Sequence, residues 1–190
     1  MTDKKKLLIY GIKGDKLETF ERISFSYGYK IRAIEDFELD FKVKDLLANT
    51  SNERPNDFVF DDEFGQDFEY MLLVNIHDEE LYNFLEELKA DGIYIPHKAV
   101  LTQTNINWPL RHLMKENMEE HKVMSVYGQL RRILPVAHNL AEKTDDSLIK
   151  EILVEAEDYF HPREFEFEEL RDIYNKLASR INELLDQDRN

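Results

Sequence analysis

The feature of this sequence that most constrains its fold is a weak internal repeat. The segment Leu7–Ile31 aligns without gaps with Met71–Ile95, and after two inserted residues Arg32-Ala33-Ile34 aligns with Lys98-Ala99-Val100. The repeat therefore predicts two similar halves that complete one shared apolar interior. The matched positions pair Leu8 with Leu72, Ile12 with Ile76, Leu17 with Leu81, Phe20 with Phe84, Gly28 with Gly92 and Ile31 with Ile95.

Each copy has the pattern of a β-α-β unit. It opens with a short apolar run, Leu7–Ile12 or Tyr70–Ile76, which is typical of a strand buried on both faces. Apolar residues at helical spacing follow. Gly28 or Gly92 then stands where the end of a helix favours a left-handed residue. A second strand closes each copy, at residues 29–34 and 95–102.

Two β-α-β units can assemble in two main ways. In the split, ferredoxin-like arrangement, the first strand of each copy lies at the centre of an antiparallel four-stranded sheet and helices cover one face. In the other arrangement, four parallel strands are covered by helices on both faces. We favour the split arrangement and an α+β fold, because the first strands are the most apolar. The second strands carry charges typical of sheet edges, namely Lys30, Arg32, His97 and Lys98.

The chain is expected to divide into a duplicated domain and a helical tail. Residues 1–118 hold the two copies, at about 5–48 and 68–118, joined by an acidic linker at 49–66 that is rich in Asn, Ser, Pro and Asp. After the second copy the strand pattern stops, and three stretches keep apolar residues at helical spacing. Residues 119–190 are therefore predicted to form a helical hairpin or a three-helix bundle.

Composition narrows the classes of function. The chain has 25 basic and 40 acidic side chains, and its formal charge of −15 argues against binding to nucleic acid or to an anionic membrane. It has no cysteine, which excludes thiolate catalysis and cysteine-based metal sites. No apolar run is long enough to span a membrane, and the first residues lack the pattern of a signal peptide. We therefore expect a cytoplasmic protein.

Charge is distributed unevenly along the chain. Residues 57–91 contain twelve acidic residues and one lysine, whereas residues 1–32 contain eight basic and four acidic side chains. This asymmetry allows the two halves, or two subunits, to dock through complementary fields. It equally serves solubility alone.

One stretch of the second copy resembles a known family. It begins with Lys98-Ala99-Val100-Leu101-Thr102, continues with Thr104-Asn105 and Trp108, and ends in a helix that carries Glu120-His121. This pattern is similar to the core of a bacterial family named domain of unknown function 3783, and residues 73–81 resemble that family as well. The resemblance covers about residues 70–124. It implies a compact α/β module and no known chemistry.

The junction between the last strand and the next helix supplies the candidate ligand-binding residues. It lies just past a strand end, where α/β proteins often bind ligands. Its hydroxyl, amide, ammonium and indole groups suit a small anionic or ring-bearing ligand, and the candidates are Lys98, Thr102, Thr104, Asn105 and Trp108. The alternative, to which we give more weight, is that these residues form turns and caps and that the indole anchors the junction to the core.

Four side chains are weak candidates for metal ligands: His112, Glu116, Glu120 and His121. A histidine and a carboxylate four residues apart on a helix can chelate a divalent ion. His112 and Glu120 stand about 12 Å apart on an ideal helix, so one ion cannot bind both of them together with Glu116. A solvated helix face is the alternative that we favour. No cofactor is expected, and no catalytic residue is assigned, because none of the six histidines lies in a catalytic motif.

Two hypotheses for function follow, and a hydrolase or metal-dependent enzyme is a third, less favoured one because no catalytic motif is present. The first is a non-enzymatic interaction or regulatory module that associates with itself or with another protein, because the chain has much amphipathic helix and no catalytic motif. The second is a small-molecule sensor with its site near residues 98–108. The sensor hypothesis depends on analogy with other β-α-β domains and on one polar and aromatic cluster.

Overall fold

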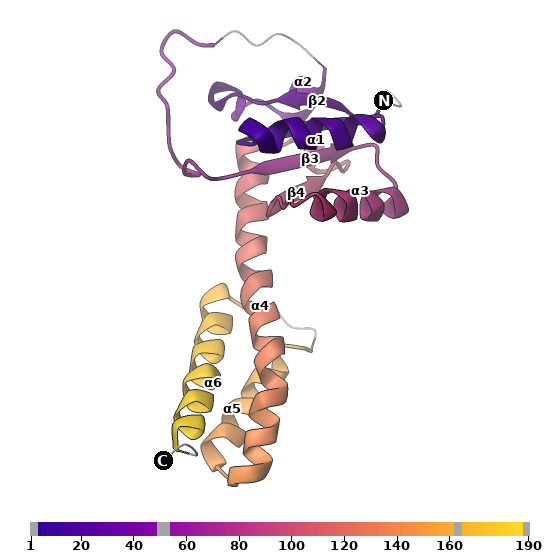
Figure 1. Cartoon of the computed structure of the whole chain (residues 1–190). Coiled ribbons are helices and arrows are strands. Elements are labelled where there is room, and N and C mark those ends of the chain that lie inside the picture. The colour runs from indigo at the N-terminus through magenta and orange to yellow at the C-terminus, as the bar shows by residue number, and fades with distance from the viewer. Residues whose placement is uncertain (1–3, 49–53, 162–164, 188–190) are drawn as a thin grey trace. The chain divides into compact units, whose positions relative to one another are not determined.

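The computed structural model describes residues 4–48, 54–161 and 165–187 and divides the chain into two compact units (Figure 1). The first unit comprises residues 1–118 and the second comprises residues 119–190. Part of the predicted acidic linker, residues 49–53, lies outside the described residues.

The first unit is built on a four-stranded mixed sheet with the order β2-β1-β3-β4. The two strands of each copy pair directly and in parallel, and β1 and β3 pair antiparallel at the centre. One helix connects the strands of each copy, α1 (Gly14–Ser26) or α3 (Asp78–Ala90). The strands are β1 (Lys6–Tyr10), β2 (Lys30–Ala33), β3 (Tyr70–Val74) and β4 (His97–Val100).

The central strand pair shows that the repeat is a structural duplication. Leu8 lies directly opposite Leu72, which is also its partner in the sequence repeat. Two equivalent residues can face each other across an antiparallel pair only where a two-fold axis relates the copies. The copies are therefore related by a pseudo-two-fold axis that passes between Leu8 and Leu72.

The two connecting helices end in the same way. Gly28 and Gly92 are both left-handed, with φ of 77° and 76°. The N–H of each glycine donates to the carbonyl three residues back, and the N–H of the next residue donates to the carbonyl five residues back. This is the Schellman motif, which satisfies the last free carbonyls of a helix. The predicted role of both glycines is confirmed.

Helices cover both faces of the sheet. On one face, α1 and α3 lie next to each other (Figure 1), and Phe20 and Phe84 meet edge to face on the apolar side chains of the central strands. On the other face, Leu8 and Leu72 pack under the segment that follows the second strand of each copy. That segment contains η1 (Asp36–Glu38) and α2 (Val43–Leu47) in the first copy, and η2 (Asn105–Asn107) and the start of α4 (Leu110–Thr144) in the second.

The α+β class, the two β-α-β units and the central position of the first strands are confirmed. The sheet nevertheless differs from the ferredoxin-like prediction, because it is mixed rather than antiparallel and helices cover both of its faces. The reason lies in the apolar residues after each second strand, such as Val43, Leu46, Leu110 and Leu113. These side chains are buried only if the second face of the sheet is covered.

The second strands also correct the sequence alignment. Leu7 pairs with Ile31, whereas the equivalent Met71 pairs with Lys98. Ile31 therefore corresponds to Lys98, which means that the second copy has three inserted residues before this strand instead of two. Because successive strand residues face opposite sides, this slip of one residue moves every aligned side chain to the other face. Lys98 is the counterpart of Ile31 and not of Arg32.

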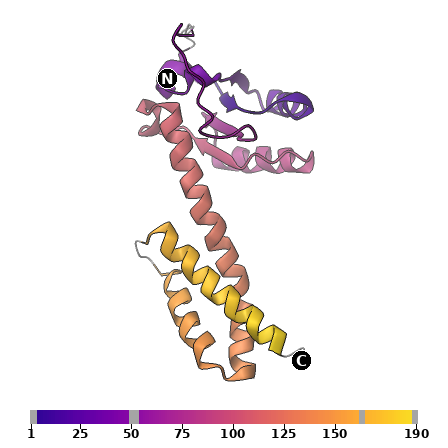
Figure 2. The ribbon, with the colours of Figure 1, turned by 90° about the vertical axis from the view of Figure 1, so that its left-hand side faces the viewer.

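The second unit consists of long helices that pack together, as predicted for the C-terminal part of the chain (Figure 2). It contains the part of α4 after Met118, with α5 (Ser147–Asp158) and α6 (Phe167–Gln187). Asp146 caps α5 by accepting the N–H of Ile149 at 2.8 Å, and Arg180 of α6 donates to the same carboxylate. Among the described residues, no helix has the length and apolar character needed to cross a membrane.

Candidate functional site

The two copies build the same turn after their second strands. In the second copy, the N–H of Thr102 donates to Asn105 Oδ1 at 2.7 Å, and the N–H of Asn105 donates to Thr102 Oγ1 at 3.1 Å. In the first copy, Glu35 and Glu38 exchange the same two bonds between side chain and backbone. These reciprocal bonds form a capping box, which satisfies free donors at the start of a helical turn. The corrected alignment, which matches Ile31 with Lys98, therefore continues through the turns.

After these turns the two copies cross each other. The N–H of Val43 donates to the carbonyl of Trp108 at 3.0 Å, and the N–H of Leu110 donates to the carbonyl of Phe41 at 3.0 Å. Lys42 and Pro109, which the corrected alignment also matches, lie opposite each other between these bonds. The crossing repeats the pseudo-symmetry of the sheet. It makes Lys44 of α2 and Arg111 of α4 equivalent residues.

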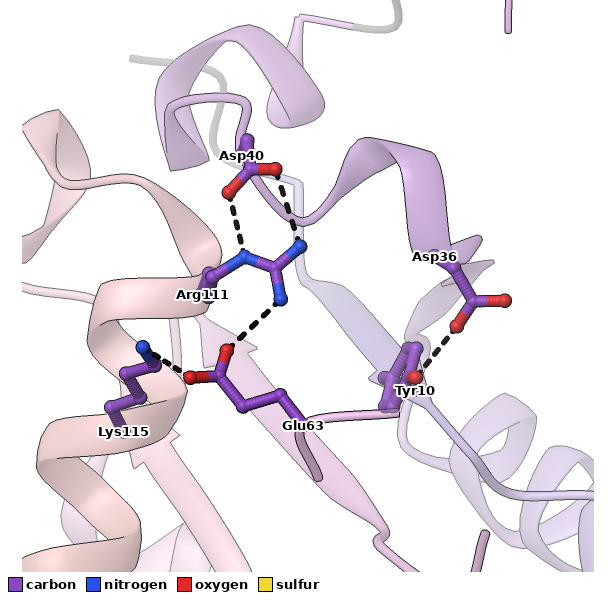
Figure 3. Close-up of polar contacts among 6 residues, drawn as sticks. All are labelled: Tyr10, Asp36, Asp40, Glu63, Arg111 and Lys115. Atoms are coloured by element: carbon purple, nitrogen blue, oxygen red, sulfur yellow. Dashed lines mark hydrogen bonds and ion pairs between the residues drawn. The ribbon is translucent and has the colours of Figure 1, made fainter. Parts of the chain in front are cut away.

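We name the two ends of the sheet by the copy whose strands end there. The first-copy end, at the end of β1, is covered by the acidic segment, defined as residues 57–69. Phe68 of this segment is buried, and its ring and that of Phe64 lie 6.4 and 6.5 Å from the ring of Tyr10. Tyr10 donates its hydroxyl to Asp36 Oδ1 at 2.7 Å (Figure 3). Burial and this hydrogen bond raise the pKa of the Tyr10 hydroxyl well above its ordinary value, so the hydroxyl keeps its proton.

Arg111 ties the acidic segment to α4 and to the first copy (Figure 3). Its guanidinium donates to both oxygens of Asp40, at 2.7 and 3.2 Å, and to Glu63 Oε2 at 3.1 Å. Lys115, one turn later on α4, forms an ion pair with the other oxygen of Glu63. Hydrogen bonds from Lys115 and Arg111 lower the pKa of the Glu63 carboxyl. The acidic segment is thus held by its charge and by its phenylalanine rings.

The second-copy end, at the end of β3, is an open cleft in the described part of the chain. Its volume is about 300 Å³, and its lining contains two lysines and no acidic residue. Lys6 Nζ donates to the carbonyl of Leu47 at 2.6 Å, and Lys44 is exposed at the rim. The lining residues are Lys6, Lys44, Leu47, Ala48, Val74, Asn75, Leu101 and Ile106.

The two ends also start from equivalent backbone. Gly11 and Asn75, which follow β1 and β3 and match each other in the repeat, are both left-handed, with φ of 76° and 58°. They differ in what lies above them. A Cβ atom on Gly11 would overlap the carbonyl oxygen of Phe68 in the acidic segment. Glycine at position 11 therefore allows the backbone of the acidic segment to approach β1 closely.

Comparison with known proteins describes the second copy. Residues 69–124 match the family model described as Domain of unknown function (DUF3783). This segment is a DUF3783 domain. It supplies the Val74, Asn75, Leu101 and Ile106 side of the cleft, while Lys6, Lys44, Leu47 and Ala48 precede it in the chain. No curated protein and no solved structure matches the chain.

The DUF3783 segment does not bring the five predicted ligand-binding residues together in one site. Thr102 and Asn105 hold the capping turn, and Thr104 is exposed beside them. Trp108 packs on the core of the face covered by α2 and α4.

Lys98 lies on the opposite face of the sheet. It is paired with Met71, which belongs to the face covered by α1 and α3. Its ammonium donates to the carbonyl of Ile95 at 3.1 Å, and burial lowers the pKa of this ammonium. Lys98 and Trp108 therefore do not form the predicted cluster, because they lie on opposite faces of the sheet.

The weak metal candidates do not form a cluster either. Among the described residues, no group of three or more His, Asp or Glu side chains is placed to hold a metal ion. His112 packs against the indole of Trp108, with ring centroids 4.7 Å apart. Glu116 and Glu120 are exposed, and His121 is partly buried.

Sequence reasoning missed Lys6 and Lys44, although a signal for Lys44 exists. In the corrected alignment, Phe41-Lys42-Val43-Lys44 matches Trp108-Pro109-Leu110-Arg111, an aromatic, any residue, an aliphatic and a cation in each copy. Extending the repeat with the two inserted residues taken from the sequence would have matched Lys44 with Leu110, so the equivalence of the two cations emerges only from the register of β4. The openness of the second-copy end had no signal in the sequence, because it depends on where the acidic segment lies.

Proposed function

We propose that this chain is a non-enzymatic cytoplasmic interaction module and that the open cleft at the second-copy end binds a segment of another protein. The observation that carries the proposal is the occupied counterpart of this cleft. The equivalent first-copy end of the sheet binds a polypeptide, the acidic segment. It does so through Arg111, at the start of α4, and through an apolar surface. The open cleft offers the same two elements, Lys44 and the side chains of Val74, Leu101 and Ile106.

The chemistry of the cleft suits recognition of a partner. Apolar walls supply binding free energy when they lose water, and a few polar groups at the rim fix the orientation of the bound segment. The Lys6 ammonium is already held by the carbonyl of Leu47, so little of its side-chain entropy remains to be lost on binding.

A cross-linking experiment tests this function. The chain has no cysteine, so a cysteine introduced at Ala48, on the cleft, carries a photo-reactive label at that position alone. We expect the labelled full chain to form an adduct with a protein from lysate of the cells that express it, and we expect Lys44→Glu to abolish the adduct.

The matched control carries the label at Glu18, an exposed residue of α1. Adducts of the same pattern from both positions, or no adduct from position 48, would contradict the proposed function.

A second candidate function is the binding of a small anionic molecule in the same cleft. Its volume of about 300 Å³ favours this candidate, because it lies at the lower end of the range for small-molecule sites. The cleft also borders the predicted region 98–108 through Leu101 and Ile106. A panel of small carboxylates and phosphates would then raise the Tm of the chain and lose this effect with Lys44→Glu. If no compound changes the Tm, this second function is wrong.

A further inference from the structure

The acidic segment on the first-copy end indicates what the open end binds. There, Arg111 binds the carboxylate of Glu63, and the next residue, Phe64, packs with Phe68 beside Tyr10. A carboxylate followed directly by a phenylalanine is thus the pair of groups that this half of the fold accepts. The pseudo-symmetry carries each receiving residue to a residue of the open cleft.

The receiving residues at the open end match this chemistry. Lys44 stands at the position of Arg111, and Val74 stands at the position of Tyr10. Lys6 stands at the position of Tyr70, which is buried under the covered end. Lys115, the second cation that binds Glu63, corresponds to Ala48, so the open cleft has two cations, Lys44 and Lys6, as the carboxylate of Glu63 has at the covered end, and it keeps an apolar surface.

The negative charge of the rest of the protein strengthens the preference of the open cleft for an acidic segment. The chain carries a formal charge of −15, yet the charged residues in the described lining of this cleft are all basic. The covered end has the opposite character, because Glu35, Asp36, Asp62 and Asp67 line its remaining space together with one lysine, Lys13. A basic concavity on an acidic protein favours an acidic segment and disfavours a basic one.

We propose that the open cleft recognises an acidic peptide segment of another protein in which a carboxylate residue is directly followed by a large apolar residue, with Lys44 and Lys6 binding the carboxylate and Val74, Leu101 and Ile106 contacting the apolar side chain. This inference depends on the proposed function and names the partner's chemistry. The acidic segment of another molecule of this same protein is a less suitable occupant. In each chain it is already held by Arg111, Lys115 and its buried Phe68.

The probe for the test is a fluorescent peptide with the sequence of residues 57–69, measured by fluorescence anisotropy against the full chain. We expect saturable binding that Lys44→Glu weakens by about tenfold or more, as for loss of a charge-assisted contact and its replacement by repulsion. The matched control is Lys42→Glu, which makes the same charge change at an exposed residue outside the cleft lining and leaves binding unchanged. Lys44→Gln gives an intermediate loss.

A charge exchange makes the test specific for the contact. A peptide with Glu63→Lys binds the wild-type chain about tenfold more weakly or worse, and it recovers affinity for the Lys44→Glu chain. Equal affinity of the wild-type and Lys44→Glu chains for the original peptide would overturn the proposal. Loss of binding in Arg111→Gln instead of Lys44→Glu would also overturn it, because the peptide would then be replacing the chain's own acidic segment.

The remaining outcomes separate this inference from the proposed function. If a protein is cross-linked from position 48 and the peptide does not bind, the acidic chemistry is wrong and the interaction module stands. If position 48 captures nothing while the peptide binds at Lys44, the cleft chemistry is right and the proposed function is wrong. If light scattering shows a dimer that Lys44→Glu dissociates, the occupant is another molecule of this same protein, which overturns the assignment to a different protein.

Discussion

The two ends of the sheet in the first unit share one architecture and differ in what lies on them. Both begin at a left-handed residue, both pass through the same reciprocal turn, and both place a cation at the start of the next helix. The first-copy end is covered by the acidic segment, whereas the second-copy end is a basic cleft of about 300 Å³. The shared features are those that the fold requires. The features that differ are those that decide what each end can bind.

The divergence is concentrated in a few side chains. Gly11 allows the backbone of the acidic segment to lie against β1, and the equivalent Asn75 carries a side chain. Tyr70 is buried at the covered end, and the equivalent Lys6 faces the open cleft. Neither change alters the backbone of the two ends. The duplicated fold thus has the same framework at both ends, while among the described residues one end is covered and the other is open.

The largest effect is expected where the acidic segment approaches the first copy. Gly11→Ala adds a Cβ atom that overlaps the carbonyl oxygen of Phe68 and stands in the left-handed region, so we expect a loss of about 3 kcal/mol in the free energy of unfolding. Asn75→Ala, at the equivalent position, adds no atom and removes the hydrogen bond from Asn75 Nδ2 to the carbonyl of Lys4, so it is expected to cost only about 1 kcal/mol. Urea unfolding measures both.

Gly14→Ala is the control for strain alone, since Gly14 is left-handed with φ of 58° and no atom lies near its Cβ position. Gly14→Ala should cost about 1 kcal/mol, from the left-handed strain of the new Cβ atom alone. If Gly11→Ala costs no more than Gly14→Ala, the close approach of the acidic segment to β1 does not exist in solution.

Substitutions at the ends of α1 and α3 are expected to lower the free energy of unfolding by less than Gly11→Ala does, and by equal amounts. Gly28→Ala and Gly92→Ala each place a Cβ atom in the left-handed region, with no atom within 4 Å to clash with it. Each substitution should therefore lower the free energy of unfolding by about 1 kcal/mol, through backbone strain alone. Equal losses of unfolding free energy, measured by thermal or urea unfolding, would support the structural equivalence of the two copies. A much larger loss at one position would show that the two helix ends are not equivalent.

The smallest expected effect is on the pKa of Glu63, the carboxylate through which the acidic segment pairs with α4. Ion pairing with Lys115 and Arg111 keeps the pKa of Glu63 below the ordinary value for glutamate. A carboxyl whose pKa is lowered by folding stabilises the fold above its unfolded pKa, and this contribution is lost as the pH falls through the folded pKa. A titration of the Glu63 carboxyl by NMR should show the lowered pKa in the wild type.

The same titration in Lys115→Ala should show the pKa of Glu63 moving back up toward the ordinary value. Lys122→Ala is the matched control, because Lys122 also lies on α4 but pairs with Glu119. An unchanged pKa of Glu63 in Lys115→Ala would mean that the acidic segment is not held by α4.

Much of the framework could be predicted because it depends on local patterns. The apolar runs of β1 and β3, the helical spacing of Phe20 and Phe84 and the terminal glycines report strand, helix and helix end from a few neighbouring residues. The candidate site was harder to predict. Thr102 and Asn105 have the residue types of a ligand site and of a turn, and only their mutual hydrogen bonds show that they form the turn.

By itself, the sequence determined that the chain is a duplication of β-α-β units followed by helices, and that an acidic segment separates the copies. These properties follow from periodicity and charge along the chain. The tertiary structure alone decided the rest. It set the parallel pairing within each copy, the face on which Lys98 lies and the crossing that makes Lys44 equivalent to Arg111. The physical reason is that a register shift of one residue or the path of one linker changes which distant side chains meet, while the local pattern of each segment stays the same.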